Sequence, residues 1–193
     1  MKHLKKYDIF LEEAEFDVQA TDTPDVKLAK NGMNTMKLNL DEYKTKKSLI
    51  DKLYLEVKDP TQIETKLKEI LGTTDIQNGK DRNPFLVEYS HLAKLKADVE
   101  SMKQQNVYDK AFIDDFNQEL RDLDANKSND PAQKLVITKK IADVNKRIMD
   151  RTPKLTQIQN DYNKSFTEHT TKINKTGSDM TEYIKKISNV NQK

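Results

Sequence analysis

The sequence predicts an all-α protein, an elongated antiparallel helical bundle of about three long coiled-coil-like helices plus short helices. Charged residues make up 34 % of the 193 residues and hydrophobic residues only 35 %. That balance suits long helices with a narrow apolar seam better than a compact globule. Apolar residues also recur in alternating steps of three and four, which is helical spacing. The chain has only 4 glycines and 5 prolines, too few for the turns of a many-stranded β fold.

The first long helix is expected to begin at Asp22 or Thr23, either of which can cap it, and to end near Asp59-Pro60. Gly32 should weaken it locally. Its seam skips one position, Lys47, and otherwise consists of Val26, Ala29, Met33, Met36, Leu40, Tyr43, Ile50, Leu53 and Val57. Asp59 can cap a short helix that Gly72 terminates.

A loop is expected over residues 73–83, and Asn83-Pro84 should begin the second long helix. Its apolar seam is Phe85, Leu92, Leu95, Val99, Met102, Ile113, Phe116, Leu120 and Leu123. Asn106 and Asp109 fall on the same seam. Buried polar groups there can fix helix register, while a local break around Gln104-Gln105-Asn106 is an equal alternative.

After a short turn over residues 125–129, Asp130-Pro131 should begin the third long helix. Its seam is Ile137, Ile141, Val144, Ile148, Leu155, Ile158 and Tyr162, with a possible extension to Phe166 and Ile173. Pro153 should kink or divide this helix, with Thr152 capping a restart. Gly177 and Ser178 should end it.

These breaks predict three segments: an amphipathic N-terminal segment (1–21), a long helical bundle (22–176), and a short C-terminal helix and tail (177–193). The short turn over residues 125–129 requires antiparallel neighbours. A three-helix bundle within one chain satisfies this pattern. The alternative is a helical hairpin that completes its core by forming a homo-oligomer.

The residue types give no support for catalysis, cofactor binding or metal binding. The chain has no cysteine. His3, His91 and His169 lack metal-ligand spacing, and we expect the latter two to be packing or surface residues. Carboxylate pairs such as Asp114-Asp115 are expected on solvated helix faces, since general acid–base work needs a pocket that separates their pKa values. We therefore expect a protein that is not an enzyme.

Charge and hydropathy exclude further classes. The 34 basic and 32 acidic residues leave a net charge of +2, whereas nucleic-acid binders usually carry a basic excess. No apolar run approaches the ~20 residues of a membrane span. The N-terminus has a basic start, but charges interrupt any apolar stretch, so we expect no membrane span and no secretion by a signal peptide.

The first residues, MKHLKKYDIFLEEAEFD, carry the most specific motif of the chain. It consists of a basic start, an aromatic residue, a Phe-Leu pair and a Leu-x-Glu-Ala sequence, at Lys2, Tyr7, Phe10, Leu11, Glu13 and Ala14. This segment resembles the capsid-targeting peptide of internal head proteins in T-even-type tailed phages, although His3, Leu4 and Lys5 are extra before the aromatic residue. The resemblance implies cleavage by a prohead protease between Glu13 and Ala14.

The same segment has two other interpretations. Leu4, Tyr7, Leu11, Ala14 and Val18 follow helical spacing, so it can be an amphipathic helix that docks on the bundle, or one that lies on a membrane surface. The resemblance implies a virion-associated structural protein: an internal head, scaffold-associated or connector component. Its partners would be phage structural proteins, in the virion or in the host cytoplasm during assembly. The alternatives are a bacterial helical adaptor or spacer and, third, a nucleic-acid-associated protein.

Overall fold

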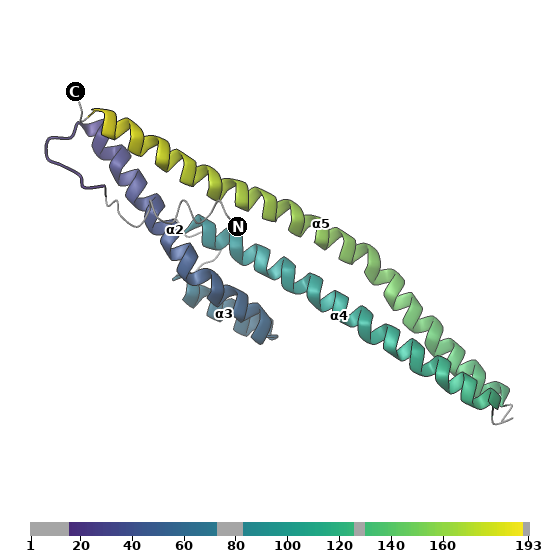
Figure 1. Cartoon of the computed structure of the whole chain (residues 1–193). Coiled ribbons are helices and arrows are strands. Elements are labelled where there is room, and N and C mark those ends of the chain that lie inside the picture. Colours follow the sequence, from purple (N-terminus) through teal and green to yellow (C-terminus); the bar gives the residue numbers. More distant parts are fainter. Residues whose placement is uncertain (1–15, 73–82, 126–129, 191–193) are drawn as a thin grey trace. The chain divides into compact units, whose positions relative to one another are not determined.

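The computed structural model describes residues 16–72, 83–125 and 130–190, with side chains up to Tyr183. Helices account for 91 % of these residues, and no strand occurs among them. The predicted all-α helical bundle is thus confirmed for the described part of the chain. Its helices, shown in Figure 1, are α2 (Pro24–Glu56), α3 (Pro60–Leu71), α4 (Pro84–Ala125) and α5 (Pro131–Val190).

Each of the four helices begins with a polar capping residue followed by proline. The side chains of Thr23, Asp59, Asn83 and Asp130 each accept a hydrogen bond from a backbone N–H of the first turn. Proline suits the position after the cap because its missing N–H would have no helical partner there. Gly72 closes α3 in the left-handed conformation, at φ 65°. These predicted boundaries are confirmed.

The described residues form two compact units, divided at Ala93/Lys94 in α4 and at Lys164/Ser165 in α5. Unit 1 contains α2, α3, the first part of α4 and the last part of α5. Its core has two buried clusters. One joins Ile50 and Leu53 of α2 with Leu67 of α3 and with Leu86 and Ala93 of α4. The other joins Met33, Leu40, Phe85 and Met180.

Unit 2 consists of the second part of α4 and the first part of α5. Val99, Ile137 and Val144 are buried, while Ile113 and Ile148 are half-buried. Contacts between the two helices run in opposite directions along the chain: Asp124 contacts Lys134, whereas Asp109 contacts Arg147. The two helices are therefore antiparallel, as the short turn predicted.

Several predicted breaks are wrong. Helix α4 is continuous through residues 104–106, which excludes a break there. Helix α5 contains Pro153 in its interior and continues past Gly177 to Val190, so residues 177–190 are not a separate short helix. Pro153 is exposed, so water can solvate the carbonyl left without a helical donor. Met180, the seam residue that follows Gly177, is fully buried, and its packing offsets the weak helix propensity of glycine.

Two seam positions and part of the N-terminal segment also differ from prediction. Met36 and Phe166 are 43 % and 49 % exposed. The seam of α5 instead continues through Ser165 and His169. Val18 lies in a non-helical stretch, held to α2 by two hydrogen bonds between the Phe16 backbone and the Asn34 side chain. An amphipathic helix therefore does not extend to residue 18.

Candidate functional site

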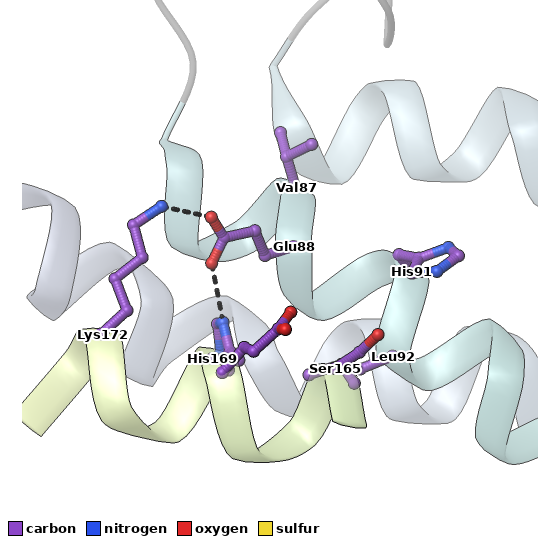
Figure 2. Close-up of a pocket in the computed structure, with 8 residues that line it drawn as sticks. Val87, Glu88, His91, Leu92, Ser165, His169 and Lys172 are labelled. Carbon is purple, nitrogen blue, oxygen red and sulfur yellow. Dashed lines mark hydrogen bonds and ion pairs between the residues drawn. The ribbon is translucent and has the colours of Figure 1, made fainter. Parts of the chain in front are cut away.

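A buried histidine connects three helices of unit 1. His169 of α5 is only 5 % exposed. Its Nδ1 lies 3.1 Å from Glu88 Oε2 of α4, and its Nε2 lies 3.3 Å from the Tyr43 hydroxyl of α2. Lys172, one turn further along α5, donates to the other Glu88 oxygen. Figure 2 shows Glu88 between Lys172 and His169. We call these four residues the His169 cluster.

Aromatic rings surround this histidine. The Tyr43 ring lies 5.4 Å from the His169 ring and 5.6 Å from the Tyr89 ring, edge to face in both pairs. Lys47 places its ammonium 5.0 Å from the centre of the Tyr89 ring. This contact explains why a lysine is tolerated on the α2 seam, because an ammonium is attracted to the face of an aromatic ring.

Two members of the cluster, Glu88 and Tyr43, have shifted pKa values. Burial raises the pKa of Glu88, but hydrogen bonds from Lys172 and His169 outweigh it, so the pKa lies below its ordinary value. Burial, together with the nearby Asp51 carboxylate, raises the pKa of Tyr43 to about 12. Glu88 is therefore a carboxylate and Tyr43 a neutral phenol at neutral pH.

A pocket of about 400 Å³ adjoins the cluster and is lined by Val87, Glu88, His91, Leu92, Ser165, Glu168, His169 and Lys172. Both His169 ring nitrogens already have partners. A general base needs a nitrogen directed at a substrate, so this geometry suits a link between helices better than proton transfer. His91, on the pocket wall, is exposed (Figure 2).

Unit 2 contains a second buried polar group, which we call the Asp109 cluster. Asp109 accepts hydrogen bonds from Arg147 at 2.9 Å and from Arg151 at 2.8 Å, and Arg151 also donates to Asn106 at 2.7 Å. Burial alone would raise the pKa of Asp109. The two guanidinium groups have the larger effect and bring this pKa below its ordinary value. The polar seam positions of α4 are thus paired with arginines of α5.

The sequence found only part of these clusters. It placed Tyr43, Asn106 and Asp109 on seams and expected His169 to be a packing or surface residue, but it did not identify Glu88, Arg147 or Arg151 as partners. One signal was available, because Arg151 occupies the seam position that the apolar pattern skips between Ile148 and Leu155. The predicted targeting residues Lys2, Tyr7, Phe10, Leu11, Glu13 and Ala14 lie outside the described residues.

Among the described residues, no group of three or more His, Asp or Glu side chains is arranged to hold a metal ion. Nor do the described helices include one with the length and apolar character that crossing a bilayer requires. Comparisons with family models, curated proteins and solved structures found no significant match.

Proposed function

We propose that this chain is a non-enzymatic structural protein that acts through protein–protein contacts made by its helical faces. The observation that supports the proposal is the exposure of large apolar side chains on every long helix. Leu28 and Leu38 on α2, Phe112 on α4, and Leu135 and Met149 on α5 are all largely exposed. Large apolar side chains that gather on one surface typically mark a site of protein association.

The polar clusters fit the same role. Each connects helices through charged or hydrogen-bonded groups that are already satisfied within the chain, and neither presents an unpaired reactive group. Such groups specify how helices pair. Helices with apolar residues on their outer faces can bind partner proteins through those faces.

We further propose a tailed-phage virion as the setting, as an internal head, scaffold-associated or connector component. The support is the resemblance of residues 1–17 to a capsid-targeting peptide. Phe16, the third residue after the implied scissile bond, is fixed to Asn34 of α2 through its backbone. Loss of the first 13 residues would leave this attachment in place.

The test is mass spectrometry of purified particles from the phage whose genome carries the gene. We expect peptides from residues 16–190 in wild-type particles and none in particles from a gene-deletion strain, which is the control. A first peptide that begins at Ala14 would support cleavage. Full coverage of capsid, portal and tail proteins without any peptide from this chain would reject the virion setting.

The bacterial adaptor or spacer is the second candidate, and the exposed apolar faces favour it equally. Gene position separates the two. A chromosomal gene remote from any capsid, portal or tail gene would favour the adaptor and leave the proposal of helical contacts intact. Binding of the purified chain to duplex DNA that weakens steeply with salt would instead favour a nucleic-acid role.

A further inference from the structure

Helix α2 carries a second line of residues beside its buried seam. This line also follows steps of three and four and consists of Leu28, Asn31, Thr35, Leu38, Glu42, Thr45 and Leu49. Its three leucines are 75 %, 69 % and 47 % exposed in chain order. We call these seven residues the leucine stripe. Leucines on one helix face at this spacing are typical of a contact with another helix.

Three of the four polar side chains of the stripe, those of Thr35, Glu42 and Thr45, have hydrogen-bond partners within the chain. The Thr35 hydroxyl donates to the Asn31 carbonyl and the Thr45 hydroxyl to the Asp41 carbonyl. The Glu42 carboxylate accepts from Lys46 at 2.6 Å and from Asn83 at 3.0 Å. A partner helix can therefore cover the stripe without leaving these groups unpaired, which lowers the cost of their desolvation.

We propose that the leucine stripe binds the leucine stripe of a second copy of this chain, with the two α2 helices antiparallel. The order of residue types is nearly the same in both directions: leucine, two polar residues, leucine, two polar residues, leucine. A two-fold axis at Leu38 sets Leu38 against its own copy and Leu28 against Leu49 of the second copy. Such a surface is self-complementary, as a two-fold contact requires.

The size of the stripe sets the strength of this dimer. It is ~32 Å long at about 1.5 Å per residue, and a helix is roughly 10 Å wide. Each copy then contributes on the order of 300 Å², or roughly 600 Å² in total. Stable complexes usually bury about 1,200 Å² or more, and smaller areas are typical of weak contacts. We therefore expect a weak, reversible dimer that forms at high protein concentration.

The first test measures the mass of the full chain by sedimentation equilibrium over a range of concentrations. The wild-type mass should rise from 22.4 kDa towards twice that value. Leu38→Glu should stay monomeric because it places two like charges against each other at the two-fold axis. The matched control is Leu55→Glu, since Leu55 lies on α2, is 72 % exposed and is outside the stripe. It should dimerise like wild type.

The second test uses the absence of cysteine in the natural chain. Leu38→Cys should form a covalent dimer under mild oxidation, and Leu55→Cys should not. A mixture of Leu28→Cys and Leu49→Cys should form mainly the mixed dimer, because antiparallel pairing sets these positions together. A predominance of dimers between two Leu28→Cys chains would overturn the antiparallel arrangement. Circular dichroism checks that each variant keeps its helix content.

Three results would overturn the proposal: a wild-type chain that is monomeric at all concentrations, equal loss of dimer in the two glutamate variants, or dimerisation only after removal of residues 1–15. The last result would mean that the chain's own N-terminal segment covers the stripe. The inference rests on the proposed role in helical contacts and not on the virion setting. A monomeric chain that is still found in particles would reject this inference alone.

Discussion

Removal of the Asp109 carboxylate is the sharpest test of how unit 2 is held together. Asp109 is buried with a side chain 9 % exposed, and Arg151, its closer partner, is 16 % exposed. Arg147 is 55 % exposed, so its ion pair should contribute only about 0–1 kcal/mol. A hydrogen bond between buried charged groups contributes about 1.5–3 kcal/mol, and an arginine left buried without its partner adds a further cost.

We therefore expect Asp109→Leu to lower the free energy of unfolding by about 3 kcal/mol and Arg151→Leu by about 2 kcal/mol. The double variant removes both charges at once and replaces them with apolar side chains in a seam. Its free energy of unfolding should lie within about 1–2 kcal/mol of the wild-type value, whereas additive effects would lower it by about 5 kcal/mol. The coupling energy between the two positions would then be about 3 kcal/mol.

Urea unfolding of the full chain, followed by circular dichroism, measures all four states of this cycle. Asp114→Leu, an exposed carboxylate on the same helix, is the control and should change stability by less than about 0.5 kcal/mol. Because the folded pKa of Asp109 is depressed, its stabilisation is present above the ordinary value of 3.8 and is lost as pH falls through the lower folded value. Additive effects, or an unchanged Asp109→Leu variant, would refute this reasoning.

Other predictions concern unit 1. The pKa of Glu88 is lowered, so its stabilisation should be lost as pH falls below 4.5, and Glu88→Gln should flatten this acid dependence in thermal melts. The Tyr43 pKa is raised to about 12 from 10.0, so stability should fall as pH rises between these values. Tyr43→Phe should abolish that loss of stability. An ultraviolet titration of this variant should show one tyrosine fewer among those that ionise at the highest pH. Gly32→Ala should stabilise the chain by about 0.5–1 kcal/mol, because a methyl group there meets no atom within 4 Å. Gly72→Ala should destabilise the chain by about 1 kcal/mol. The backbone angle φ of Gly72 is 65°, and residues with a side chain are strained in this left-handed conformation. Urea unfolding measures the stability of both variants. A change of the same sign in both would contradict the prediction.

The helix boundaries could be predicted from the sequence because they depend on neighbouring residues. A capping side chain followed by proline satisfies the first turn of a helix wherever that helix packs. The division that Pro153 allowed and the break expected at Gly177 are wrong, because tertiary context decides whether a helix ends at such residues. Pro153 is on a solvated face, and the turn after Gly177 carries the buried Met180. The helix propensity of the local residues indicates neither the exposure of Pro153 nor the burial of Met180.

The polar clusters needed information that one helix cannot supply. The α4 pattern shows that Asp109 lies on a seam, but its partner depends on the register between α4 and α5. The same holds for His169, whose partners Glu88 and Tyr43 lie on two other helices. The spacing of the apolar residues along a helix indicates which face is buried. The contacts across that face depend on the register between the helices.

That alignment itself depends on the Asp109 cluster. The apolar seams of unit 2 repeat every seven residues, so a slip of one heptad would preserve most apolar contacts. After such a slip the places of Arg147 and Arg151 would be taken by Lys140 and Val144 or by Lys154 and Ile158. Either slip would thus replace the more buried arginine with an apolar side chain and leave Asp109 a single lysine as partner. The observed register is the one of the three that gives this carboxylate two guanidinium partners. The double Asp109→Leu/Arg151→Leu variant, although nearly as stable, should therefore lose this preference and populate shifted pairings that are disfavoured in wild type.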